Sequence, residues 1–85
     1  MDIRNRVIQC IAGVLKKETV EIEKLPEEEA LNIVGVDSIN FVEIIVSLEE
    51  EFQIAFDDEE LLLQNLDTMR KLCAVIGGKL ENAVA

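Results

Sequence analysis

The chain has 85 residues, of which 49% are apolar and 31% are charged, which suffices for one small hydrophobic core and excludes a disordered tail. Its 8 Lys and Arg against 18 Asp and Glu give a formal charge of −10, which argues against nucleic acid or an anionic membrane as a partner and favours a basic protein surface. Because the chain contains no His, Ser-His, Cys-His and zinc-His arrangements are excluded, and we expect neither catalysis nor a metal site.

The start of the sequence and its cysteines indicate a cytoplasmic protein. Residues 1–4 lack the apolar run of a signal peptide, and no apolar stretch approaches the roughly 20 residues that span a bilayer. Cys10 and Cys73 both fall on predicted apolar helix faces, so buried free thiols are favoured over a disulfide. We expect a monomer with one domain over residues 1–85, a core of about residues 2–80 and a mobile tail at 81–85.

The first predicted helix runs from about Asp2 to Lys17. Its apolar residues follow the spacing of one buried stripe: Ile3, Val7, Ile8, Ile11, Val14 and Leu15. The next segment, residues 18–37, is predicted to be a long connection. Thr19–Glu23 alternates like a strand, but no second strand exists to pair with it.

This connection carries its own apolar anchors. We expect it to bury Val20, Ile22 and Leu25, to be punctuated by Pro26 and to continue through Glu27–Glu29, which can open a short helical turn. Leu31 and Val34 are the next anchors, and Gly35 permits a sharp turn. A connection of about twenty residues is unusual in a small domain, and loops of this length are often functional.

The second long helix is predicted from about Ser38 to Phe52, with Asp37 as its N-cap. On a helical wheel of about 100° per residue, one side is the core face: Phe41, Ile44, Ile45, Leu48 and Phe52. A different side carries a second apolar stripe beside two acids: Ile39, Val42 and Val46 next to Glu43 and Glu50. A small bundle can bury only one of these two stripes well.

Two further helices complete the predicted fold. Asp57–Glu60 followed by Leu61–Leu63 indicates a short third helix with acids in its first turn. The fourth begins near Asp67 or Thr68, is predicted to end or fray at Gly77-Gly78, and buries Met69, Leu72, Cys73, Ile76 and Leu80. The fold class is therefore all-α: a small four-helix bundle of three long helices and one short one, with a long loop between helices one and two.

The distribution of charge is more informative than its sum. No Lys or Arg occurs between Lys24 and Arg70, and that stretch holds thirteen acids. Such a surface can simply keep a protein in solution. The exclusion of every base from the middle of the chain, beside an exposed apolar stripe, favours a docking face.

Ser38 follows a loop and opens the helix that carries the exposed stripe. A serine at a helix start is ordinarily a cap. A phosphate ester on its hydroxyl would lie at a helix N-terminus, where free amides and the helix dipole favour an anion. Without His the serine has no partner base in this chain, so another protein would have to modify it.

Gly35-Val36-Asp37-Ser38-Ile39, followed by FVEIIVSLEEEF at residues 41–52, resembles the acyl carrier protein family. That family has a glycine, any residue, then aspartate-serine-leucine at the start of a helix that ends in acids and a phenylalanine. The resemblance covers most of the chain, including the order of helices and the long loop. The motif at a helix start, in an acidic chain of this length, is a strong signal.

The resemblance implies that Ser38, in its Asp37-Ser38 motif, receives 4′-phosphopantetheine from coenzyme A through a separate phosphopantetheinyl transferase. The thiol of the arm then carries an acyl group as a thioester, and the chain presents it to acyl-loading and acyl-processing enzymes with basic docking patches. The family's docking surface matches positions outside the predicted core: Ile39, Val42, Glu43, Val46 and Glu50. A tether of this kind replaces diffusion with a high effective concentration.

Three departures from the carriers of fatty-acid synthesis bear on the pathway. Ile39 stands where leucine is commoner, Asn40 where an acid is usual, and Ala55-Phe56 where isoleucine-proline is typical. We therefore favour a specialised carrier for a polyketide, a modified lipid or a peptide natural product, with an aminoacyl carrier as the close alternative.

Two interpretations from other classes stay open. An acidic helical interaction domain without a prosthetic group would use Glu43, Glu50 and the exposed stripe to bind a basic partner. Calcium binding through Asp57–Glu60 is disfavoured, because four consecutive acids lack the alternating ligand spacing of a calcium loop.

Overall fold

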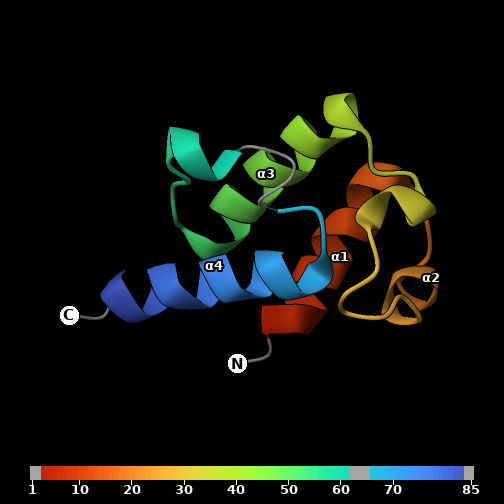
Figure 1. The fold of residues 1–85 in the computed structure, drawn as a ribbon, viewed down its shortest axis with the longest axis horizontal. Coiled ribbons are helices and arrows are strands. Elements are labelled where there is room, and N and C mark those ends of the chain that lie inside the picture. Colours follow the sequence, from red (N-terminus) through yellow and green to blue (C-terminus); the bar gives the residue numbers. More distant parts are fainter. Residues whose placement is uncertain (1–2, 62–65, 84–85) are drawn as a thin grey trace.

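The computed structural model describes residues 3–61 and 66–83. Over these residues the fold is helical (Figure 1), with four α-helices and two 3₁₀ turns in the order α1 (Ile3–Leu15), α2 (Thr19–Glu23), η1 (Leu31–Val34), α3 (Ser38–Phe52), η2 (Asp58–Leu61) and α4 (Met69–Ala83). Three α-helices are long and one is short, which confirms the predicted all-α bundle.

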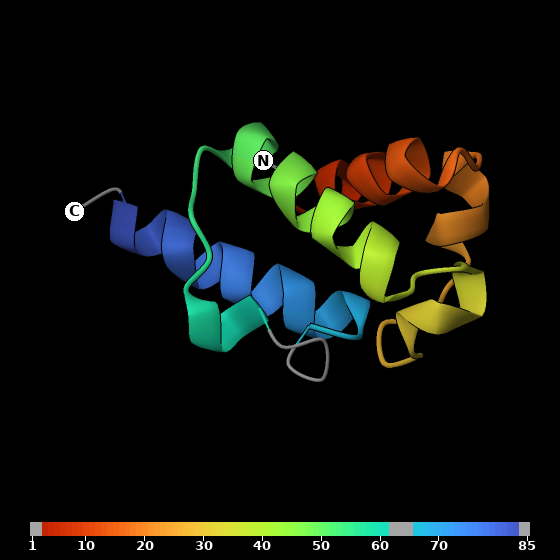
Figure 2. The ribbon, with the colours of Figure 1, turned by 90° about the horizontal axis from the view of Figure 1, so that it is seen from above.

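The core lies where α1 meets the other helices. α1 packs against α2, α3 and α4, and Figure 2 shows α1 and α3 side by side. The predicted core face of α3 is buried throughout: Phe41, Ile44, Ile45, Leu48 and Phe52. It meets apolar side chains from α1 and α4, chiefly Val7, Ile8, Ile11, Met69, Leu72 and Ile76.

Arg6 joins α1 to the C-terminal end of α3. Its Nε lies 2.8 Å from Glu51 Oε2, and its Nη2 donates to the Glu51 carbonyl oxygen at 2.7 Å. Its guanidinium carbon lies 4.4 Å from the centroid of the Phe52 ring. A cation at this end also complements the negative pole of the helix dipole.

The first helix is shorter than predicted because the chain leaves helical geometry early. Lys16 adopts a positive φ of 57°, and Lys17 N donates to the Ala12 carbonyl oxygen at 2.9 Å, which closes the helix at Leu15. Asp2, the predicted start, lies outside the described residues. Cys10 and Cys73 form no disulfide, as predicted, but both are half-buried rather than buried. Burial raises the pKa of the Cys10 thiol.

The loop predicted over Thr19–Glu23 and the predicted burial of Val20 were wrong, because this segment is the helix α2. In a strand, Val20 and Ile22 would point to the same side, whereas in a helix two residues rotate by about 200°. Accordingly Ile22 is fully buried and Val20 is 44% exposed. The helix also satisfies its own backbone hydrogen bonds, so it needs no pairing strand. Leu25 is buried, as predicted.

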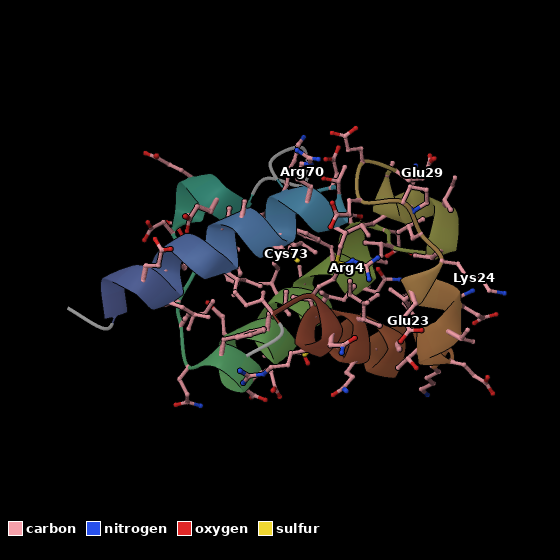
Figure 3. The ribbon with its side chains drawn as sticks, turned by 90° about the horizontal axis from the view of Figure 1, so that it is seen from below. Arg4, Glu23, Lys24, Glu29, Arg70 and Cys73 are labelled. Atoms are coloured by element: carbon pink, nitrogen blue, oxygen red, sulfur yellow. The ribbon has the colours of Figure 1, made fainter. Side chains whose placement is uncertain are left out.

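Two arginines hold the rest of the connection in place. Arg4 reaches from α1 toward the end of α2 (Figure 3), where its Nη2 donates to the carbonyl oxygen of Glu23 at 3.4 Å. Arg70 of α4 lies 3.4 Å from a carboxylate oxygen of Glu28. Leu31 is buried and its N–H donates to Asp67 O at 2.8 Å. The connection before α3 is therefore contacted both by α1 and by the start of α4.

The short third helix is a 3₁₀ turn, η2, at Asp58–Leu61, and Leu62 and Leu63 of the prediction lie outside the described residues. α4 begins where predicted, with Thr68 Oγ1 accepting from Lys71 N at 3.2 Å. It does not end at Gly77-Gly78 but continues to Ala83, so most of the predicted mobile tail is helical. At Gly77 the helix lies close to α1, since a Cβ built on this residue would stand at an ordinary van der Waals distance of 3.7 Å from Ile3 Cδ1.

Candidate functional site

The turn into α3 is formed by Gly35. The 3₁₀ turn η1 ends there, with a left-handed φ of 108°, and Gly35 N donates to the Asn32 carbonyl oxygen at 3.1 Å. A side chain would be strained in this backbone region, which is why the position favours glycine. Val36 is buried immediately afterwards, so the chain is anchored just before α3 begins.

Asp37 caps α3, as predicted, and Asn40 completes the cap. Asp37 Oδ1 accepts from Ile39 N and Asn40 N, both at 2.9 Å. Asn40 Oδ1 accepts from Asp37 N at 2.7 Å, and Asn40 Nδ2 donates to Gly35 O at 2.8 Å. Sequence reasoning treated Asn40 only as a departure from a family pattern. Its place three residues after an N-cap was the available signal for a reciprocal capping box.

Ser38 is the first residue of α3, and its side chain is exposed. Capping belongs to Asp37, the predicted N-cap, so the ordinary capping role of a serine at a helix start does not apply to Ser38. The amides of Ile39 and Asn40 are occupied by the Asp37 carboxylate, so they are not free to hold an anion. Ser38 therefore presents a hydroxyl at a rigid helix start, and a modified Ser38 would keep every hydrogen bond of the cap.

The predicted second stripe of α3 is exposed. Ile39 is 77% exposed, Val42 60% and Val46 47%, although each is a large apolar residue. Glu43 and Glu50 beside them are exposed as well. Exposed apolar side chains grouped on one helix face, with acids among them, form a surface that a partner can cover. We call these five residues the α3 face.

A groove lies between α3 and η2, next to the α3 face. Its volume is about 190 Å³, and its lining consists of five apolar side chains and one acid: Phe41, Val42, Ile45, Val46, Leu61 and Glu49. Glu49 Oε2 accepts from Phe56 N at 2.9 Å, which ties α3 to the segment leading into η2. Sequence reasoning missed this groove, because it depends on where η2 packs rather than on the pattern within any one helix.

The acids of η2 do not converge on a cation site. Glu60 Oε1 lies 2.6 Å from Lys79 Nζ of α4 and accepts from Asp57 N at 2.7 Å. These two donors lower the pKa of Glu60. Among residues 3–61 and 66–83, no group of three or more His, Cys, Asp or Glu could hold a metal ion. In the same part of the chain no helix is long and apolar enough to cross a membrane.

Comparison with known proteins identifies the class. Residues 5–76 match the family described as "Phosphopantetheine attachment site". The chain is 25% identical over 84 residues to "Aminoacyl carrier protein 1" of Bradyrhizobium diazoefficiens, covering 99% of this chain and 92% of that protein. It is 30% identical over 79 residues to "Acyl carrier protein" of Coprothermobacter proteolyticus, covering 91% and 94%. A third relative, "Acyl carrier protein" of Desulforapulum autotrophicum, is 35% identical over 60 residues, covering 71% and 77%.

The chain belongs to the family of phosphopantetheine-binding carrier proteins. The prosthetic group of this family is 4′-phosphopantetheine, and its members are generally non-catalytic proteins that interact with partner enzymes. The structure offers a place that fits such a group, because Ser38 is exposed at a helix start whose cap does not use its hydroxyl. A bulky arm there would displace no buried side chain.

Proposed function

We propose that this protein is an acyl carrier whose 4′-phosphopantetheine arm is attached to Ser38. The observation that carries the proposal is the exposure of Ser38 at the first position of α3, beside a cap that Asp37 and Asn40 complete without it. The other serine, Ser47, lies mid-helix, is half-buried and is hydrogen-bonded with Cys10. Of the two hydroxyls, only that of Ser38 is presented for modification.

Attachment requires a separate phosphopantetheinyl transferase and coenzyme A. Ser38 Oγ would form a bond to the phosphorus that bears the pantetheine, and the bond from that phosphorus to 3′,5′-ADP would break. The hydroxyl proton would pass to a base of the transferase, because this chain contains no His. The role of this chain is to hold the hydroxyl in a fixed, accessible position.

The α3 face is the proposed docking surface for the transferase and for acyl-loading and acyl-processing enzymes. Ile39, Val42 and Val46 would supply the apolar contact, and Glu43 and Glu50 would attract a basic patch. A carrier must release each partner quickly, so a small interface steered by charge suits it better than a large dry one.

The groove supports an acyl cargo. Phe41 and Val42 lie about one helical turn from Ser38 on the same helix, so a group tethered to Ser38 can reach the groove. Its mostly apolar lining favours a hydrocarbon chain over a charged group. The departures from fatty-acid carriers favour specialised lipid, polyketide or peptide biosynthesis. A cytoplasmic location remains a prediction from the sequence.

An aminoacyl cargo is the second candidate, and it would use the same arm and the same face. It is favoured by the relative from Bradyrhizobium diazoefficiens named an aminoacyl carrier protein, which aligns along 99% of this chain. Parallel attempts to load the arm with amino acids and with acyl groups would show which of the two cargoes the protein accepts.

The mass of the intact protein tests the carrier proposal. Co-expression with a phosphopantetheinyl transferase should add the mass of one arm to the wild type and to Ser47→Ala, but nothing to Ser38→Ala. An unchanged mass of the wild type would instead support an acidic interaction domain without a prosthetic group. Loading of Ser38→Ala would show that the arm is attached elsewhere.

A further inference from the structure

Leu61 of η2 is the wall of the groove opposite α3, here called the outer wall. The segment from Phe56 to Leu61, which carries it, is held at two points. On the α3 side, Glu49 accepts a hydrogen bond from Phe56 N at 2.9 Å. On the α4 side, Lys79 Nζ lies 2.6 Å from Glu60 Oε1. Leu61, which lines the groove, directly follows Glu60.

The Lys79–Glu60 pair is less exposed than the Arg70–Glu28 and Lys71–Asp67 pairs of the same helix. Its side chains are 18% and 29% exposed, whereas those of Lys71–Asp67 are 47% and 39% exposed. Lys79 Nζ also lies 5.6 Å from the centroid of the Phe56 ring, and the same Glu60 oxygen accepts from Asp57 N. A less exposed pair with additional partners is screened less by solvent and fixes its two elements more firmly.

The volume of the groove limits what it can hold. A cavity of about 150 Å³ lined by apolar side chains is large enough for benzene. The groove, at about 190 Å³, therefore has room for a hydrocarbon chain of roughly six to eight carbons. A longer chain would have to leave its remaining methylenes in water or push the outer wall away.

We propose that Lys79 and Glu60 form a latch that fixes η2 against α4, and that this latch limits the apolar acyl cargo of Ser38 to a short chain. The inference rests on the proposed carrier function, because it requires a cargo tethered to Ser38. Lys79 and Glu60 are positioning residues: neither lines the groove, and both act through Leu61, which directly follows Glu60 and does line it.

Chain-length dependence of thermal stability tests the latch. The protein would be loaded with butanoyl, hexanoyl, octanoyl, decanoyl or dodecanoyl phosphopantetheine by a transferase, and the gain in Tm over the unmodified protein would be measured. In the wild type the gain should rise to about eight carbons and then level off, because further methylenes stay in water. In Lys79→Met the gain in Tm with dodecanoyl should be about 1.5 times the gain with octanoyl, since more methylenes become buried.

Three further variants give the comparison its controls. Arg70→Met removes a cation from the same helix, but one paired with Glu28 of the connection rather than with Glu60. Lys79→Arg keeps the charge, and both should level off where the wild type does. Glu60→Gln breaks the latch from the other side and should behave like Lys79→Met, which keeps the test usable if Lys79→Met does not fold.

The outcomes separate the latch from the carrier function. If the wild type loads and all variants level off at the same chain length, differing only by a constant Tm offset, Lys79 is merely structural and the latch is overturned. An equal extension in Arg70→Met would also overturn it, because loss of any cation of α4 would then suffice. If the wild type accepts no arm, the proposed function itself fails, and the latch loses its cargo.

Discussion

The two apolar faces of α3 contain the same kinds of residue, but one face is buried and the other is exposed. Ile44 and Ile45 are buried in the hydrophobic core, whereas Ile39, on the same helix, is 77% exposed. Hydrophobicity alone does not decide burial, because a face is buried only where a second element packs against it. In a bundle this small, the other elements cover only one face of α3. The other face keeps its apolar side chains in water, which is useful only if a partner covers them for part of the time.

The largest expected effect is a difference in the free energy of unfolding between two variants, each truncated on one face of α3. Ile44→Ala should lower the free energy of unfolding by ~2–5 kcal/mol, because it removes buried methylenes and leaves a cavity. Val46→Ala should cost less than about 1 kcal/mol, because Val46 is half-exposed and packs against no covering helix. Urea denaturation of the two variants measures the difference. Equal losses would mean that the α3 face is structural.

A second comparison contrasts Asp37 with Ser38 at the start of α3. Asp37→Ala should cost about 0.5–2 kcal/mol, because two backbone amides lose their acceptor. Ser38→Ala should change the free energy of unfolding by only a few tenths of a kcal/mol, since alanine is a good first-turn residue and no cap bond is lost. A thermal melt of each variant decides the point, and a large loss in Ser38→Ala would assign the serine a structural role.

The smallest expected effect on stability comes from reversing charges on the α3 face. Glu43→Lys and Glu50→Lys should leave the free energy of unfolding nearly unchanged, or raise it slightly by relieving repulsion in a chain of charge −10. Loading by the transferase should nevertheless slow, and the wild-type rate should fall as salt rises, because exposed charge steering is screened. Variants that load at the wild-type rate in low salt would reduce the acidic face to a solvated surface.

The sequence pattern within a helix predicted its bounds where that pattern alone determines them. The bounds of α3 were correct because Asp37 is a clear cap and the apolar spacing ends at Phe52. α2 was missed because five residues are too few to distinguish a strand pattern from a short helix. α4 continues through Gly77-Gly78, where the helix lies close to Ile3 of α1 and where Lys79 pairs with Glu60, and neither neighbour is local in the sequence.

The candidate site divides in the same way. The exposure of Ile39, Val42 and Val46 followed from the periodicity of α3 alone. The groove did not, because Leu61 reaches it only through the packing of η2 against α3. The role of Asn40 lay between these cases, since its spacing from Asp37 was visible in the sequence but its bond to Gly35 O depends on the turn.

The central claim is that Ser38 carries the arm, and peptide mapping tests it most directly. The purified protein would be incubated with coenzyme A and a phosphopantetheinyl transferase, digested, and analysed by tandem mass spectrometry. The account predicts one arm per chain, with fragment ions that place it on Ser38 and leave the peptide containing Ser47 unmodified. An arm mapped to any other residue, or no arm on a chain that is folded by circular dichroism, would contradict the account.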